Sequence, residues 1–351
     1  MTRAVGIDPG TLSIDVCGIE NGRLYLDRSW PTEEALARPD SFIELITAAG
    51  IPDLIAGPSG YGLPMLRAAD ATDADLRLAF LAAPDEPGGL GGLRSFARRL
   101  AASGLPVVYT PGVIHLNTVP AHRKLNRVDL GTADKLCAAV LAVHEHCARR
   151  QRSPGQASFI LLELGGAFTA AVAVEEGRIV DGVGGTSGPI GWRAVGALDG
   201  EVAFLAGTVS KTSLFQGGVS SLDQGNQASS ELGLPAYIEG AIKAVRQLHC
   251  SAPSADEVLL SGRMGADPGI FQRLSTELSD IGPVMHLKGF ASIAKQGAQG
   301  AALLADGLAG GTEQDLVDWM RIREARGTVL DHLVFISPAA ARLRLGIPVH
   351  D

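Results

Sequence analysis

The sequence has few cysteines and no long apolar run. Its cysteines lie far apart and form no Cys-x-x-Cys pair: Cys17, Cys137, Cys147 and Cys250. This usage fits a reducing cytosol better than a disulfide framework. The longest apolar runs, such as LCAAVLAV, are too short to span a bilayer, and the opening Met-Thr-Arg lacks the apolar stretch of a signal peptide. We therefore expect a cytoplasmic protein with no membrane partner.

Positive charge is also scarce. The chain carries 30 Lys and Arg against 38 Asp and Glu, a formal net charge of −8. This balance argues against a nucleic-acid partner, because a phosphate backbone attracts cationic surfaces. Hydrophobic residues make up 46% of the 351 residues, enough for sizeable cores in two domains. The 44 glycines follow no collagen-like period and indicate tight turns and close backbone approaches.

One stretch of the chain is repeated later in the sequence. VGIDPGTLSIDVCGIENGRL begins at Val5, and LLELGGAFTAAVAVEEGRIV begins at Leu161. With Asp8 aligned to Glu163, Gly10 falls on Gly165, and Gly22-Arg23 falls on Gly177-Arg178, without a gap. A shared register over this length indicates an internal duplication.

The expected elements repeat in the same order. In the first half we predict strands at Ala4–Asp8, Ser13–Glu20 and Arg23–Ser29, a helix at Glu33–Ala49, strands in PDLIAGPSG and LPVVYTPGVI, and a helix at Ala133–Arg149. In the second half we predict strands at Ser158–Leu164, Thr169–Glu175 and Arg178–Val183, helices at Pro235–His249, Pro268–Leu278 and Ser292–Leu308, and strands in EVLLSG and PVMHLKG. Both halves therefore read βββαβαβα, which predicts two duplicated α/β domains, each a mixed five-stranded sheet with helices on its faces, with a cleft between them.

The predicted boundaries follow from composition. The polar stretch Arg149–Ser158 separates a first domain, residues 1–152, from a second, residues 153–311. A polar helix at Glu313–Arg326 belongs to a C-terminal tail, residues 312–351. Gly60–Gly92 is predicted to be an insertion or flexible loop. For the Gly/Ser-rich stretch Gly185–Gly233, a mobile lid and a poorly ordered excursion both stay open.

The first repeated turn suits phosphate and Mg²⁺. Gly10 lets backbone N–H groups approach an anion, Thr11 adds a hydroxyl donor, and the Asp8 carboxylate can hold Mg²⁺ or one of its waters. A second loop, Gly165-Gly166, is expected to face the first across the cleft, so that the two clamp one polyphosphate. Asp-Pro-Gly by itself is a common turn, so the duplication carries this prediction. Glu163 is either a water-mediated metal ligand or a residue that stabilises the turn.

These motifs resemble the acetate kinase, sugar kinase, Hsc70 and actin superfamily. GIDPGT is similar to its first phosphate motif, LELGGAF to its second, and EVLLSGRMG to its adenosine motif. The resemblance implies two ribonuclease H-like domains with a cleft between them, the actin-like ATPase fold. It also implies ATP and Mg²⁺ as cofactors and adds a nucleotide contact at Gly262, Arg263 and Met264. Within the superfamily, GRIVDGVGGTSGP is similar to the butyrate kinase branch, and GFASIAKQGAQGAALLADGLAGG is similar to a late helix of acyl kinases. The chain as a whole looks most like an uncharacterised family of predicted butyrate kinases. Two positions depart from the usual motifs: Glu163 replaces Asp or His, and the adenosine turn reads Ser-Gly-Arg rather than Gly-Gly.

The densest polar stretch is HRKLNRVDLGTADK, which precedes the helix at Ala133–Arg149. The resemblance places it at the floor of the cleft, as the acceptor-substrate site. Our candidates for catalysis are Arg127, Asp129 and Asp134, and those for substrate binding are Arg123, Asn126, Lys135 and Arg193. Among them, Arg127 and Arg193 are expected to stabilise charge, and Asp129 to act as a general base or to hold metal. Thr132 with Asp134 also fits an ordinary helix N-terminus, and the basic residues also fit a solvated face. A carboxylate acceptor needs cations but no general base, whereas a hydroxyl acceptor uses an Asp as base.

The sequence favours a phosphotransferase that uses ATP and Mg²⁺ on a small acceptor, such as a short-chain carboxylic acid. The alternative is a nucleotide-binding ATPase or switch of the same fold with no small-molecule acceptor. A carbamoyl transferase is disfavoured because His144 and His146 lie two apart on a helix and point in different directions. The dispersed cysteines disfavour an iron–sulfur activator. A homodimer is expected by resemblance alone.

Overall fold

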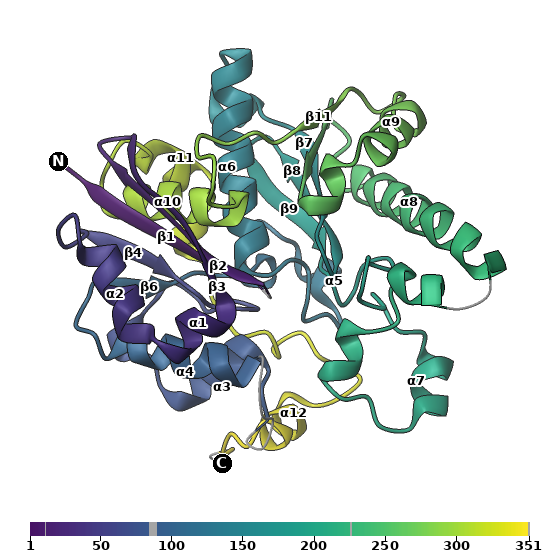
Figure 1. The fold of residues 1–351 in the computed structure, drawn as a ribbon, viewed down its shortest axis with the longest axis horizontal. Helices are drawn as coiled ribbons and strands as arrows, with labels where there is room; N and C mark the ends of the chain where they lie inside the picture. Colours follow the sequence, from purple (N-terminus) through teal and green to yellow (C-terminus); the bar gives the residue numbers. More distant parts are fainter. Residues whose placement is uncertain (11, 84–89, 225–226, 350–351) are drawn as a thin grey trace. The chain divides into compact units, whose positions relative to one another are not determined.

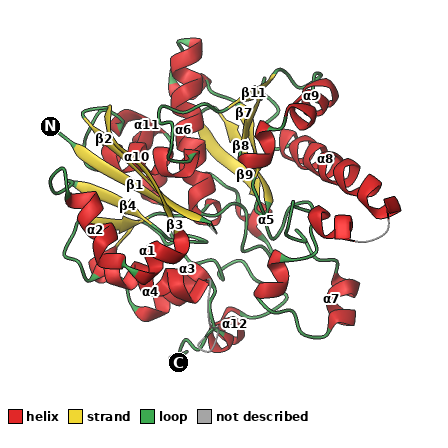
Figure 2. Cartoon of the chain, in the orientation of Figure 1, coloured by secondary structure: helices red, strands yellow, loops and turns green. Residues whose placement is uncertain are grey.

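Two β-sheets organise the chain, and their strands follow one another in matching order. The computed structural model describes residues 1–10, 12–83, 90–224 and 227–349. The strand order of the first sheet is β3-β2-β1-β4-β6-β5. The order of the second sheet, given from the corresponding edge, is β9-β8-β7-β10-β11. Figure 2 shows the strands of both sheets among the helices. The strands of the first sheet are β1 Arg3–Pro9, β2 Ser13–Glu20, β3 Arg23–Pro31, β4 Leu54–Gly57, β5 Leu66–Arg67 and β6 Val107–Tyr109. Those of the second are β7 Phe159–Leu164, β8 Thr169–Glu175, β9 Arg178–Val183, β10 Val258–Ser261 and β11 Val284–His286.

The duplication predicted from the sequence is confirmed in backbone detail. The pairing of β2 with β3 shifts register between Gly18 and Ile19, and that of β8 with β9 shifts between Ala173 and Val174, the aligned positions. The following turns repeat the same left-handed pair: φ is 49° and 74° at Asn21-Gly22, and 50° and 73° at Glu176-Gly177. Such values suit Gly and Asn and define the tight hairpin.

The chain forms two compact units whose boundaries differ from the predicted domains. Unit 1 comprises Met1–Val128, Thr132–Pro154 and Lys288–Asp351, and unit 2 comprises Asp129–Gly131 and Gly155–Leu287. The break at Pro154 falls inside the predicted linker. The helix predicted at Ser292–Leu308, α10 Gln296–Leu308, was assigned to the second domain, but it belongs to unit 1 and packs on β1 and on α6 Ala133–Arg150 (Figure 1).

Glycine explains why α10 belongs to unit 1. A Cβ on Gly6 of β1 would lie 2.2 Å from the carbonyl oxygen of Ala298 in α10. A Cβ on Gly300 would lie 1.7 Å from the carbonyl oxygen of Cys137 in α6. Real Cβ atoms do not approach backbone so closely, so only glycine at both positions lets α10 lie directly on the strand and the helix.

The opposite face of the first sheet is covered by four helices: α1 Thr32–Ala37, α2 Pro39–Thr47, α3 Asp73–Phe80 and α4 Leu90–Ala101. Val5 and Ile7 of β1 pack there with Phe42 of α2 and Phe80 of α3. The sequence predicts one helix over Glu33–Ala49, but the structure has two. Arg38 precedes Pro39, and the residue before a proline disfavours the helical backbone conformation. Arg38 therefore has a φ of −131°, which separates the two helices.

The predicted insertion at Gly60–Gly92 is a folded part of unit 1 where it is described. It supplies β5, an edge strand, and α3, which begins with a capping box between Thr72 and Asp75. Leu76 and Phe80 of α3 are buried in the core, so this part is not a flexible loop. The polar spacing in α3 and the glycine-rich end of Gly60–Gly92 gave no clear helix signal in the sequence, so α3 was not predicted. Residues 84–89 lie outside the described part of the chain.

Unit 2 buries one face of its sheet under α8 Gln227–His249 and α9 Pro268–Glu277. Helix α8 begins eight residues before the predicted start and contains Pro235. The stretch Gly185–Gly233 contains the short helix α7 Gly200–Ala206, on which Phe204 and Leu205 are exposed. A lid at this place stays a prediction.

The remaining helices are short. They are α5 Ala121–Lys124, α11 Gln314–Trp319 and α12 Pro338–Arg344. The tail helix predicted at Glu313–Arg326 is shorter in the structure. Helix α11 ends at Trp319, and a separate 3₁₀ turn follows at Ile322–Glu324. Across the described ranges, no helix combines the length and the apolar character that a bilayer crossing requires.

The Gly300→Ala variant tests the close packing of α10. Alanine favours a helix over glycine by about 1 kcal/mol, but its methyl group would meet the Cys137 carbonyl. We expect a net loss of about 1–3 kcal/mol in the free energy of unfolding, measured by urea denaturation. Gly200→Ala, where an added Cβ meets nothing within 4 Å, is the control. A Gly300→Ala variant as stable as the wild type would contradict this packing.

Candidate functional site

Strand alternation places Asp8 on the face of the first sheet that α10 covers. Val5 and Ile7 face the core with α1–α4, so Gly6 and Asp8 face α10. Asp15 lies directly opposite Asp8 on β2. Both carboxyl groups are buried, with Asp8 only 8% and Asp15 1% exposed. Two carboxylates facing each other repel, so this pair is unusual for a purely structural sheet.

The Asp8 carboxyl has no hydrogen-bond or ion-pair partner among the described residues. It lies at the N-terminus of α10, where a Cβ on Gly297 would be 2.7 Å from its Oδ2. Burial, with a smaller contribution from Asp134, raises the pKa of Asp8 to about 7. Buried carboxyl groups normally have partners, so an unpartnered one at a helix N-terminus indicates a ligand site.

Asp134, a predicted catalytic residue, lies next to Asp8. It occupies the first turn of α6, and its Cβ would be 3.4 Å from a Cβ on Gly297. Burial acts to raise the pKa of Asp134, but Lys135 and Thr132 hold it below its ordinary value. Lys135, a predicted substrate residue, donates to Asp134 at 2.5 Å. Asp134 and Lys135 thus lie with Asp8, and we call these three residues the Asp8 cluster.

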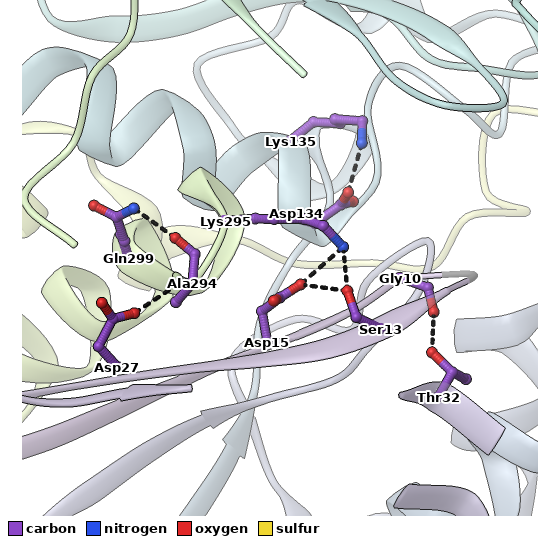
Figure 3. Close-up of polar contacts among 10 residues, drawn as sticks. All are labelled: Gly10, Ser13, Asp15, Asp27, Thr32, Asp134, Lys135, Ala294, Lys295 and Gln299. Atoms are coloured by element: carbon purple, nitrogen blue, oxygen red, sulfur yellow. Dashed lines mark hydrogen bonds and ion pairs between the residues drawn. The ribbon is translucent and has the colours of Figure 1, made fainter. Parts of the chain in front are cut away.

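Lys295, which was not among the residues predicted from the sequence, lies beside the Gly10 turn. It is the N-cap residue of α10, and its Nζ donates to Ser13 Oγ at 2.7 Å and pairs with Asp15 at 2.8 Å (Figure 3). A Cβ on Gly10 would lie 2.9 Å from the same Nζ. The available signal in the sequence was the lysine that begins KQGAQGAA, at the start of a predicted helix of small residues.

The two repeated loops have the same hydrogen-bonded turn. In unit 1, the Gly10 N–H donates to the Ser13 carbonyl at 2.8 Å. In unit 2, the Gly165 N–H donates to the Phe168 carbonyl at 3.0 Å, again at aligned positions. Thr11 lies outside the described residues. That the two loops bind one triphosphate stays a prediction.

Arg193 lies at the glycine loop of unit 2. Its Nε donates to the Gly166 carbonyl at 2.9 Å, and its backbone N–H donates to the Ala167 carbonyl. A Cβ on Gly166 would meet nothing within 4 Å, so this side of the loop is open. Glu163, near the end of β7, is 3.6 Å from a Cβ on Gly165, which places its carboxyl beside the same loop.

The adenosine-motif turn lies against this loop. Gly262 has φ +84°, and a Cβ there would be 2.4 Å from the Leu164 carbonyl oxygen. Arg263 is exposed and Met264 packs on the unit 2 core. Ser261, opposite Glu163 on the neighbouring strand, is buried with its Oγ unpartnered. These predicted residues therefore lie together in unit 2.

Asp129, predicted as a catalytic base, makes structural contacts. Its carboxylate accepts from the Gly131 N–H and from both the N–H and the hydroxyl of Thr186, at 2.8–3.2 Å. A Cβ on Gly184 would clash with it. It is 3% exposed and ties residues 129–131 to the turn after β9. Both carboxylate oxygens of Asp129 therefore accept internal hydrogen bonds, and its catalytic role stays a prediction.

Asn126 also has a structural contact that the sequence did not indicate. Its Oδ1 accepts from the N–H groups of Val334 and Phe335, both at 2.8 Å, so it anchors the C-terminal segment. Arg123 and Arg127 are half-buried on and after α5. The structure thus separates Asn126 and Asp129, which have internal partners, from Asp134 and Lys135, which join Asp8.

The Asp8 cluster fits Mg²⁺ in one respect. Mg²⁺ usually takes one or two carboxylates and completes its shell with water and phosphate oxygens. Asp8 offers such a carboxylate without a competing donor. Within the described part of the chain, no group of three Asp, Glu, His or Cys residues could hold a metal by itself, so a bound Mg²⁺ would need ligands from a phosphate.

The raised pKa of Asp8 predicts a pH-dependent stability. The folded pKa, about 7, lies above the ordinary 3.8, so the folded chain binds more protons than the unfolded chain between these values. The stability from this group is present at low pH and is lost as pH rises through about 7, with a slope of at most about 1.4 kcal/mol per pH unit. Without ligand, Asp8→Asn is expected to become more stable than wild type as pH rises from 4 to 8, measured by urea denaturation. A pH-independent difference would contradict the shift.

Comparison with solved structures supports the fold. A propionate kinase from Francisella tularensis subsp. tularensis SCHU S4 is 14% identical, with 86% of this chain and 98% of that chain covered and a TM-score of 0.59. An acetate kinase from Entamoeba histolytica is 10% identical, with 80% and 87% covered and a TM-score of 0.58. An acetate kinase from Porphyromonas gingivalis is 12% identical, with 80% and 88% covered and a TM-score of 0.55. At these identities the likeness shows the actin-like ATPase fold of acetate kinases and no more.

A search of curated proteins finds no significant match. A family model described as "Protein of unknown function (DUF1464)" matches residues 6–335, nearly the whole chain. The chain therefore belongs to the DUF1464 family.

Proposed function

We propose that this protein is an ATP- and Mg²⁺-dependent phosphotransferase whose acceptor is a small carboxylate, such as a short-chain fatty acid. The observation that carries the proposal is the buried, unpartnered Asp8 carboxyl at the N-terminus of α10, beside the Gly10 turn. A helix N-terminus and a glycine turn favour phosphate, and a free carboxylate favours Mg²⁺.

Some residues of the chain would supply charge for the metal and the transferred phosphate, and others would position the phosphate. Asp8 would hold Mg²⁺, directly or through water, with Asp134 beside it. When bound, Mg²⁺ would offset the negative charge of the phosphate oxygens. The Gly10 and Gly165 N–H groups close their own turns, and the Gly166 N–H of the unit 2 turn would be presented to phosphate. Arg193, at the Gly166 carbonyl, would stabilise charge that develops during transfer.

The environment of Asp129 favours a carboxylate acceptor over a hydroxyl acceptor. A hydroxyl needs a general base to take its proton, and Asp129 was the predicted base. Its oxygens already accept from Gly131 and Thr186. A carboxylate acceptor is ionised at neutral pH, with an ordinary pKa of about 4, and needs no base. The acetate and propionate kinases that share the fold bear names of the same acceptor class.

Calorimetric titration with Mg-ATP tests the nucleotide site. We expect saturable binding by the wild type and an affinity about ten- to a hundred-fold lower for Asp8→Asn, because a charged ligand contact is lost. Asp70→Asn, which removes a carboxyl group 63% exposed in a loose pair with Arg67, should bind as the wild type does. Absence of Mg-ATP binding by the wild type would refute the proposal.

Trapping with hydroxylamine tests the acceptor. With Mg-ATP and formate, acetate, propionate or butyrate, we expect an acyl phosphate that hydroxylamine converts to a hydroxamate, with turnover of about 1–100 s⁻¹ for the preferred acid. Polyols should give no ADP above background. If ATP binds and is hydrolysed without any hydroxamate, the protein is a nucleotide switch or ATPase, and the phosphotransferase assignment is wrong.

A further inference from the structure

The segment Lys288–Lys295, which we call the strap, leads into α10, and side chains accept hydrogen bonds from its first seven backbone N–H groups. Glu145 of α6 accepts from the N–H groups of Lys288 and Gly289. Gln299 of α10 accepts from the next two, Phe290 and Ala291. Asp27 of β3 accepts from the last three, Ser292, Ile293 and Ala294. Seven successive backbone N–H groups are thus held by three side chains.

Such an arrangement fixes a segment that has no helix or strand bonds of its own. Buried or half-buried backbone N–H groups need acceptors, but water or a single turn would serve most of them. Here the acceptors come from three different elements of unit 1, and Gln299 also donates to the Ala294 carbonyl at 2.7 Å (Figure 3). The residue that follows is Lys295, so the strap determines where its side chain starts.

Lys295 extends from this point toward the Gly10 turn. Its side chain is 49% exposed, while its partner Asp15 is 1% exposed. A Cβ on Gly10 would be 2.9 Å from its Nζ, so the ammonium lies at the loop where phosphate is proposed. The unpartnered Asp8 carboxyl lies at the N-terminus of the same helix. A positive charge here would offset the repulsion between phosphate and the Asp8, Asp15 and Asp134 carboxylates.

We propose that Lys295 binds a phosphate group of the nucleotide and that Asp27, through the strap, is its positioning residue. This inference rests on the proposed function. In the free protein the Lys295 ammonium is held by Ser13 and Asp15. A bound phosphate provides oxygens to the same ammonium, which forms compact, charge-assisted hydrogen bonds with phosphate. The competing explanation is that Lys295 only neutralises the buried Asp15.

Lys295→Met tests the charge, with ATP, ADP and adenosine titrated separately. We expect the affinity for Mg-ATP to fall about ten- to a hundred-fold, as for loss of a charged hydrogen bond. The affinity for adenosine should change less than about two-fold, as for a substitution away from its contacts. Lys243→Met, which removes an exposed lysine paired with Glu239 on α8, is the matched control and should bind both ligands as the wild type does.

Asp27→Asn tests the positioning and keeps Lys295 itself. The neutral side chain accepts more weakly from the strap, so we expect the affinity for Mg-ATP to fall about three- to ten-fold, by loosening one or two hydrogen bonds, with adenosine unaffected. This variant decides the matter if Lys295→Met does not fold. A purely structural strap would lower the melting temperature of both variants and change the ATP and adenosine affinities equally, which would overturn the inference.

The outcomes separate this inference from the proposed function. If the wild type does not bind Mg-ATP, the proposed function fails. If the wild type binds Mg-ATP and folded Lys295→Met binds it equally well, only the role of Lys295 fails.

Discussion

The close approach of α10 to β1 and α6 is the constraint on which the site of unit 1 depends. Gly6 and Gly300 remove the side chains that would hold these backbones apart. The same packing brings the N-terminus of α10 against Asp8 and places Lys295 over the Gly10 turn. A helix that sat a few ångströms away would leave Asp8 exposed to water, and its pKa would be ordinary.

This packing concentrates negative charge in a buried place. Asp8, Asp15 and Asp134 share the neighbourhood of two lysines, and Asp8 has a pKa raised to about 7, chiefly by burial. Such a cluster costs stability in the free protein, since charged groups are expensive to bury. Strain of this kind is common at functional sites, where a ligand supplies the missing partners. Asp129 shows the opposite case: it is also buried, but both of its carboxylate oxygens accept hydrogen bonds, and it links chain segments.

Much of the fold could be predicted because its signal is local and repeated. Alternating apolar residues and the Asn21-Gly22 turn define the hairpins, and β2, β8 and β9 have the predicted bounds. That α10 belongs to unit 1 could not be predicted from the sequence, because it depends on glycine contacts between residues far apart in the chain. Asp8 and its loop were found from their motif. Lys295 was missed because its neighbours, Ser13 and Asp15, are distant in sequence. The backbone partners of Asn126 could not be predicted, because the contacts of a polar residue cannot be identified from its type.

The most direct test of the account is a crystal structure with a non-hydrolysable ATP analogue and Mn²⁺ in place of Mg²⁺. The anomalous signal of Mn²⁺ locates the metal without ambiguity. The account predicts a peak within direct or one-water reach of the Asp8 carboxylate, roughly 2–4 Å from an oxygen, with phosphate density at the Gly10 turn. A metal and triphosphate bound elsewhere, with Asp8 still unpartnered, would contradict it.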